Sequence, residues 1–166
     1  MDKNERFWIG TTRFTNYTYK ENQDWRERFK WKGCIYGLNK KMPLTVPHLG
    51  LVFVLEMNND QNKIMGIGKI INKVYTDRKY RVYEERNYNR YTYCGKLRIS
   101  REFIKEKLEK LEKLEKLEKR LFKGKSHLKR GQGISRVPPD VYKEYLYFCI
   151  SACSLMESAS LPPIIL

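Results

Sequence analysis

The sequence predicts an α+β protein in which a small β-barrel or curved mixed sheet is combined with one long charged helix and a C-terminal helix. Short β-branched and aromatic runs, separated by turn residues, predict a β-rich domain at residues 1–100. A Glu-Lys-Leu repeat, in which every residue type favours helix, predicts the long helix at 101–123. Residues 124–166 then hold a basic loop and the C-terminal helix, which we expect to pack on the same domain.

The first elements follow from aromatic content and turn residues. Residues 22–29 predict a short helix, and residues 33–37 predict a strand between two glycines. The clearest strand is the apolar run at 51–57, and a second strand follows at 63–71. Because only Asn-Asn-Asp-Gln-Asn separates these two runs, we expect a β-hairpin.

The second strand of this hairpin carries Gly66 and Gly68, which lie on one face because they are two residues apart. Glycines at such positions indicate a sharp bend or the close approach of another backbone. Three shorter runs, at 80–83, 88–93 and 96–99, predict further strands.

The long helix is expected to begin after Ser100, a favourable N-cap, and to extend for roughly 34 Å. Four of the five Glu of the repeat at 106–119 have a Lys four residues later, the better orientation for such pairs. The leucines recur every three residues, so they sweep about 180° around the helix and cannot form one coiled-coil seam. We therefore expect a charged, partly solvated helix that acts as a spacer, with its ends docked on the protein.

The charge balance points to an acidic partner. The chain has 34 Lys and Arg against 19 Asp and Glu, a net charge of +15, and the repeat itself is neutral. The excess therefore belongs to the rest of the chain, which is typical of proteins that bind nucleic acid. The alternative is a basic protein that is merely soluble.

Neither a metal site nor a catalytic motif is evident. The four cysteines form no Cys-x-x-Cys pair and only two histidines are present, so we expect no metal, no cofactor and reduced intracellular thiols. The longest apolar stretch, at 145–156, is too short to span a bilayer, so we expect no membrane partner.

Tyrosines and basic residues alternate between residues 75 and 98. Aromatic faces stack on unpaired bases while Arg and Lys neutralise phosphates, so this pattern favours nucleic-acid binding. The alternative is that the tyrosines, which are good strand formers, fill the core, where we expect about half of them. The candidate contacts are Arg78, Arg81, Arg90, Tyr80, Tyr83, Tyr88 and Tyr91.

A second basic stretch, at 120–136, contains six Lys and Arg, three glycines and no acid. Glycines allow backbone N–H groups to approach a phosphate, although the spacing is not that of a nucleotide P-loop. The alternative is a flexible basic surface loop. The candidate phosphate contacts are Lys123, Lys125, Lys129, Arg130, Gly131, Gly133 and Arg136.

The three tryptophans, Trp8, Trp25 and Trp31, form a third candidate. Together they could make an aromatic pocket around a base or a methylated cation. The alternative is that they anchor the core.

The apolar run at 52–55, the Ile-Met-Gly-Ile-Gly-Lys-Ile segment at 64–70 and the basic tyrosine-rich stretch after it resemble PUA-like β-barrel domains. This superfamily includes the EVE and YTH modules, and the resemblance covers about residues 33–99. It implies a small mixed barrel flanked by helices, with recognition of RNA or a modified base in a pocket.

These observations predict a non-catalytic nucleic-acid-binding protein, with RNA favoured over DNA. The alternative is a basic scaffold that binds acidic proteins, with a partner at helix 101–123 or at the hydrophobic tail 161–166. A third hypothesis is a nucleic-acid-modifying enzyme. The Lys-, Asn-, Ile- and Tyr-rich composition resembles that of proteins from AT-rich genomes, such as those of large DNA viruses acting in the host cytoplasm.

Overall fold

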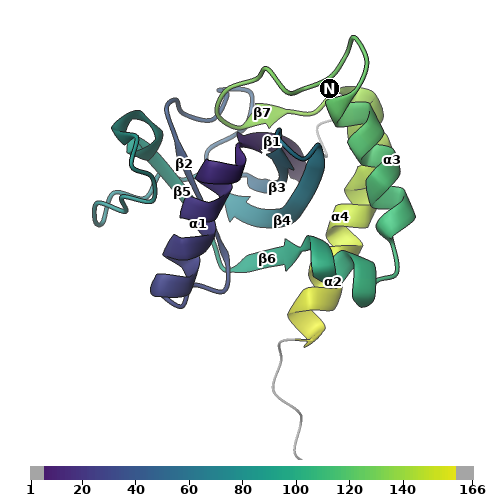
Figure 1. Cartoon of the computed structure of the whole chain (residues 1–166), viewed down its shortest axis with the longest axis horizontal. Helices are drawn as coiled ribbons and strands as arrows, with labels where there is room; N and C mark the ends of the chain where they lie inside the picture. Colours follow the sequence, from purple (N-terminus) through teal and green to yellow (C-terminus); the bar gives the residue numbers. More distant parts are fainter. Residues whose placement is uncertain (1–5, 160–166) are drawn as a thin grey trace, which may run out of the picture.

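A five-stranded mixed sheet forms the centre of the protein in the computed structural model, which describes residues 6–159 (Figure 1). The strand order is β6-β4-β3-β1-β7. β1 runs parallel to β3, and the other neighbouring pairs are antiparallel. The strands are β1 (Phe7–Phe14), β3 (Leu51–Asn58), β4 (Lys63–Ile71), β6 (Leu97–Ser100) and β7 (Ser135–Arg136).

A second, two-stranded sheet is made by β2 (Cys34–Leu38) and β5 (Tyr91–Gly95). It approaches β4 closely: a Cβ on Gly68 would lie 2.1 Å from the Tyr36 hydroxyl oxygen, and one on Gly95 would lie 1.9 Å from the Lys69 carbonyl oxygen. The close approach predicted from the glycines of β4 is therefore confirmed. Within residues 6–159 the strands do not close into a barrel, so the curved mixed sheet is the form of the predicted α+β fold that the protein adopts.

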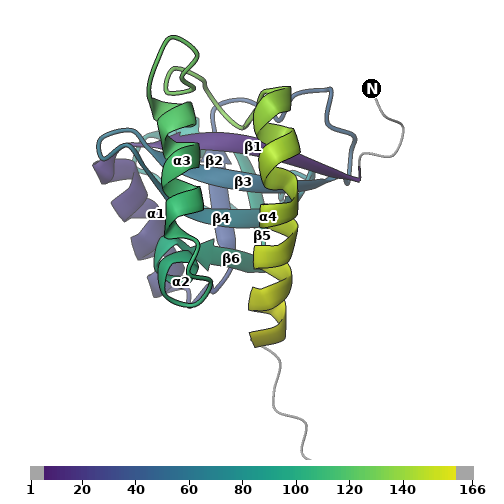
Figure 2. The ribbon, with the colours of Figure 1, turned by 90° about the vertical axis from the view of Figure 1, so that its right-hand side faces the viewer.

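Helices cover both sides of the five-stranded sheet. Figure 2 shows α3 and α4 across one face, with β2 and β5 behind the strands and α1 alongside them. α1 spans Asn16–Arg28, α2 spans Arg101–Glu106, α3 spans Leu111–Phe122 and α4 spans Pro139–Ala159. No helix in the described part of the chain is both long and apolar enough to cross a membrane.

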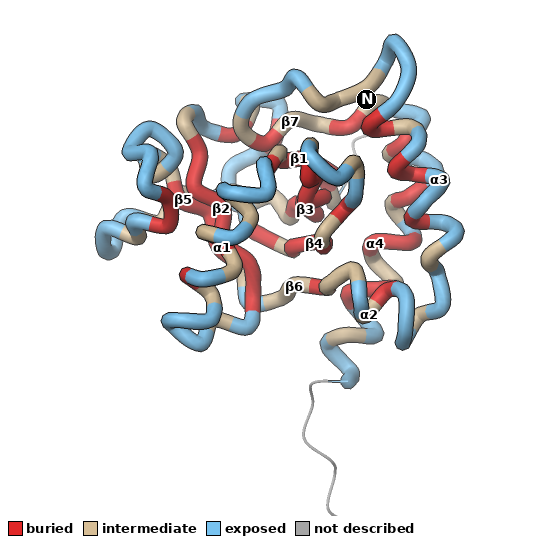
Figure 3. The backbone as a smooth tube through the Cα atoms, viewed as in Figure 1, coloured by how far each residue is buried: buried red, intermediate tan, exposed pale blue. Residues whose placement is uncertain are grey.

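The core has two halves, one on each face of the sheet, and buried segments concentrate on the strands and on the inner sides of the helices (Figure 3). Successive residues of β3 pack alternately into one half of the core and the other. Phe53 and Leu55 pack with α2, α3 and α4, whereas Val52 and Val54 pack with β2, β5 and α1. Both faces of β3 are therefore buried, which explains why its residues 51–55 are continuously apolar.

Several predicted elements are confirmed. β3 and β4 form the expected hairpin, and Ser100 caps α2 by accepting a hydrogen bond from the Phe103 N–H. The predicted short helix begins six residues earlier, at Asn16, because Thr15 and Thr18 form a capping box. The C-terminal helix is confirmed, and the tail at 161–166 lies outside the described residues.

The prediction of one helix over 101–123 is wrong. α2 ends at Glu106, Glu109 has a positive φ of 52°, and α3 begins at Leu111. The break resets the helix phase, so that leucines spaced three and four apart in α3 face the sheet. Three of them, at positions 114, 117 and 121, are fully buried, so the repeat belongs to the core and is not a solvated spacer.

One acid of the repeat is also buried. Glu118 accepts from Arg101 Nη1 at 2.6 Å and from the Ile64 N–H at 2.7 Å. These bonds tie α3 to the start of α2 and to β4. The repeat was expected to present its charges to solvent, but this position contributes to packing instead.

The predicted strands at 80–83 and 88–93 are also corrected. Residues 80–83 have no regular structure, and Tyr88 lies in a short 3₁₀ helix, η1 (Arg86–Asn89). Only residues 91–93 of the second run belong to a strand, β5. The tyrosine-rich segment is therefore largely a loop on the outer side of the smaller sheet.

Candidate nucleic-acid interface

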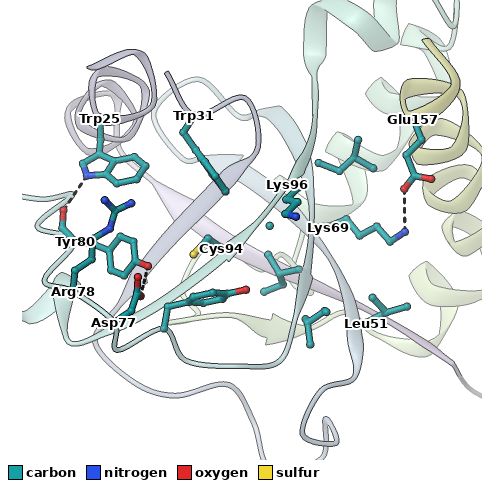
Figure 4. A pocket seen from close by; sticks show the side chains of 15 residues that line it. Trp25, Trp31, Leu51, Lys69, Asp77, Arg78, Tyr80, Cys94, Lys96 and Glu157 are labelled. Carbon is teal, nitrogen blue, oxygen red and sulfur yellow. Dashed lines mark hydrogen bonds and ion pairs between the residues drawn. The ribbon is translucent and has the colours of Figure 1, made fainter. Parts of the chain in front are cut away.

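Four aromatic side chains surround a cavity of about 570 Å³ near the C-terminal ends of β4 and β5 (Figure 4). We call it the aromatic pocket. Trp25, Trp31, Tyr75 and Tyr80 contribute the rings. Its apolar remainder comes from the sheets and includes Leu51, Ile70, Ile71, Cys94, Gly95 and Leu97.

Backbone carbonyls hold both tryptophans of this pocket in place. The Trp25 indole N–H donates to the Tyr80 carbonyl at 2.9 Å, and that of Trp31 donates to the Cys34 carbonyl at 3.0 Å. Because each indole nitrogen is already bonded, a ligand would meet these two side chains through their ring carbons. Trp25 is 7% exposed and Trp31 is half-buried.

Charged groups line the rim of the aromatic pocket. Lys69 Nζ pairs with Glu157 of α4 at 3.2 Å, and the Arg78 guanidinium lies 4.8 Å from the centre of the Tyr80 ring. The Tyr80 hydroxyl donates to Asp77. Burial, reinforced by this hydrogen bond, raises the pKa of Tyr80 to about 12, so the phenol stays neutral at physiological pH.

A second hollow, of about 680 Å³, shares Tyr75, Arg78 and Tyr80 with the aromatic pocket. We call it the basic groove. Among its lining residues, five are basic and only Glu84 is acidic. The basic residues are Arg78, Lys79, Arg81, Arg86 and Arg90. The structure thus brings together five of the seven contacts predicted between residues 75 and 98.

A third hollow, of about 260 Å³, lies beside the basic loop and is called the loop hollow. Its lining residues include Tyr83, Tyr88, Lys129, Gly131 and Gly133. Because Tyr83 also lines the basic groove, the two hollows share a wall.

The remaining basic candidates lie apart from this hollow. Lys123, Lys125 and Arg130 are exposed and line none of the three hollows. Arg136 lies in β7, opposite Gly10 of β1. The basic loop is therefore not a single cluster, since only part of it faces a cavity.

Some of the aromatic candidates also lie in the core or outside the hollows. Trp8 is 8% exposed and packs in the core, where its ring lies 3.0 Å from a Cβ placed on Gly50, so it is not part of the aromatic pocket. Tyr83 is also buried, and its hydroxyl accepts from Asn22 at 2.9 Å. Tyr91 stacks against Arg90 and Lys41 outside the three hollows.

Sequence reasoning missed Arg13, which lies beneath the basic loop and lines the loop hollow. No local signal pointed to it, because the strand that carries it, β1, was itself not predicted from the sequence. Reasoning also missed the buried ion pair between Arg98 and Glu56, at 2.6 Å, behind the glycines of β4. Burial opposes ionisation of Glu56, yet the Arg98 guanidinium lowers its pKa below the ordinary value.

The described residues offer little reactive thiol or metal-binding chemistry. The four cysteines are buried and unpaired. Burial raises the pKa of Cys94, which faces the aromatic pocket, to about 11, so it is a thiol and not a thiolate at neutral pH. Among residues 6–159 no three His, Cys, Asp or Glu side chains lie close enough together to hold a metal ion.

Comparisons with protein-family models, with curated proteins and with solved structures find no match to this chain.

Proposed function

We propose that this protein is a non-catalytic nucleic-acid-binding protein that holds an unpaired base in the aromatic pocket and the neighbouring phosphates in the basic groove. The observation that carries this proposal is the wall common to both cavities. Tyr75, Arg78 and Tyr80 line the aromatic pocket on one side and the basic groove on the other. A nucleotide has the same two-part chemistry, with a flat base attached to a charged backbone.

The aromatic pocket suits a planar heterocycle. Trp31, the more exposed of its two tryptophans, is held by its indole N–H, so a base could stack on its ring, an interaction that contributes about 1–3 kcal/mol per base. Its rim carries Lys69, Arg78 and Lys96 against Asp77 and Glu157, which disfavours a simple cation as the ligand.

A single strand is the preferred form of the ligand, because a base inside a duplex is unavailable for stacking on a protein. RNA is favoured over DNA because single-stranded loops are the usual targets of RNA-binding proteins, and because the sequence resembles PUA-like domains. The same resemblance makes a modified base a candidate ligand. We further propose that this activity is intracellular. The composition resembles that of proteins from AT-rich genomes, such as those of large DNA viruses acting in the host cytoplasm.

The scaffold alternative keeps only part of one of its two proposed surfaces. The leucine face of α3 packs against the protein's own sheet, with Leu114, Leu117 and Leu121 fully buried. Only the charged side of this helix is left for a protein partner.

The direct test measures the affinity of the protein for single-stranded RNA, duplex RNA and duplex DNA of equal length by fluorescence anisotropy. Single-stranded RNA should bind most tightly, and Trp31→Ala should weaken it about tenfold, the loss of one stacked base. Tyr147→Ala is the control, because Tyr147 is 80% exposed on α4 and lines none of the hollows. Equal affinities for the wild type and Trp31→Ala, with both folded by circular dichroism, would reject the proposal.

A further inference from the structure

The guanidinium of Arg13 lies under the basic loop and is bonded only to neutral groups. It donates to the backbone carbonyls of Thr11, Leu128 and Gly133 at 2.8–3.1 Å, and to the hydroxyls of Thr11 and Ser135 at 3.0 Å. Two of these carbonyls bracket the loop segment 128–133. Arg13 therefore anchors that segment to β1.

Within residues 6–159, no acid balances the charge of Arg13. None of the described carboxylates forms an ion pair with it, whereas the buried Arg98 and Arg101 each pair with a glutamate at 2.6 Å. Burial lowers the pKa of Arg13 to about 10, which leaves the side chain charged at neutral pH. A partly buried charge that has no counterion among the described residues is costly, so an anion nearby would be stabilised.

A second basic residue, Lys129, lines the loop hollow together with Arg13. Lys129 Nζ donates to the Asn62 side-chain oxygen at 2.8 Å, which is a neutral partner, and has two further N–H groups to offer. None of the residues that line the loop hollow is acidic. Asn39, Gln132 and Tyr88 add side-chain donors to the same wall.

The glycines allow the loop backbone to lie directly over Arg13. A Cβ on Gly131 would be 2.6 Å from Arg13 Nη1, and Gly133 has a φ of +66°, a conformation that favours glycine. No loop side chain at position 131 therefore screens the guanidinium. Two polar atoms of residues that line the hollow, Arg13 Nε and Asn59 Oδ1, are buried without a hydrogen-bond partner.

We propose that the loop hollow is a phosphate-binding site, in which Lys129 donates to the phosphate oxygens and Arg13 supplies fixed positive charge and holds the loop. The inference deepens the proposed function, because Tyr83 separates this hollow from the basic groove and a bound strand could extend from one to the other. Arg13 is a positioning residue, since its terminal N–H groups are already bonded to the protein.

Thermal unfolding in inorganic phosphate, compared with chloride at the same ionic strength, tests the site without any nucleic acid. A ligand that binds only the folded state raises the melting temperature in proportion to its occupancy. The wild type should be stabilised by phosphate, and Lys129→Gln should weaken the apparent phosphate affinity about tenfold, as expected for the loss of one charge-assisted hydrogen bond. Lys125→Gln is the matched control, because Lys125 is an exposed lysine of the same loop that does not line the hollow.

One further measurement, the affinity of Lys129→Gln for single-stranded RNA, separates the sources of the phosphate. If Lys129→Gln also weakens single-stranded RNA binding, the hollow holds a backbone phosphate. If it removes only the response to inorganic phosphate, the hollow holds a free phosphate group. Equal melting temperatures of the wild type in phosphate and chloride, or equal losses from Lys129→Gln and Lys125→Gln, would overturn the inference. Trp31 lines the aromatic pocket and not the loop hollow. The RNA test of Trp31→Ala can therefore support the proposed function even where the phosphate test of the loop hollow fails.

Discussion

Leu117→Ala measures how much the Glu-Lys-Leu repeat contributes to the core. Leu117 is fully buried among side chains of the sheet and α4. The substitution removes three carbon atoms, which is about 2.4 kcal/mol of lost burial at about 0.8 kcal/mol each. The cavity left behind adds to this loss, so we expect about 3–4 kcal/mol. For a chain of this length, that lowers the melting temperature by about 10 °C.

Leu108→Ala is the matched control, because it is the same change in the same repeat at a position that is only half-buried, between α2 and α3. It should cost about 1 kcal/mol. Urea unfolding followed by circular dichroism gives both free energies. Equal and small losses for the two variants would refute the reasoning, since they would place both leucines in solvent and return the repeat to the role of a spacer.

Three other predictions follow from the charges and the rings. Binding to single-stranded RNA should weaken by orders of magnitude between about 50 and 200 mM salt if five or six cations contact phosphates, and a flat response in an anisotropy titration would contradict this. Because the pKa of Glu56 is lowered in the folded state, its contribution to stability is present above the unfolded value of about 4.3 and lost as the pH falls through the folded value. Tyr36→Phe removes a 2.7 Å hydrogen bond to Glu56, so the pKa of Glu56 in the folded state should be lowered less than in the wild type. The free energy of unfolding, measured against pH, should then fall over a narrower pH range on acidification. RNA should quench the fluorescence of a Trp8→Phe variant as strongly as that of the wild type, because Trp8 lies outside the aromatic pocket, and a lost quench would place the ligand elsewhere.

The elements that the sequence predicted well are those whose partners are close in the chain. The β3–β4 hairpin needs only two apolar runs and a five-residue turn, and the start of α2 needs only Ser100 and the N–H of Phe103. The basic groove was also visible, because its arginines and tyrosines all lie within one segment of about twenty residues. Local spacing is enough to place such groups near one another.

The elements that the sequence did not predict depend on distant partners. β1 is a central strand, but its parallel pairing with β3 joins residues 44 positions apart, and the Gly-Thr-Thr-Arg in its middle weakens the alternation of a strand. The leucine spacing showed that the repeat could not present one face throughout, yet only packing against the sheet decided that the helix would break after Glu106.

The residues of the candidate site show the same difference between what the local sequence predicts and what the folded chain decides. Composition alone determined that basic and aromatic residues were available for nucleic acid, and that the excess charge lay outside the repeat. Only the tertiary structure decided that Trp8 belongs to the core and that Arg13 lies beneath a loop 120 residues further along the chain. Hydrogen bonds and turns act between neighbours and can be read locally. Burial is settled by which surfaces meet when the whole chain is folded, and no short segment contains that information.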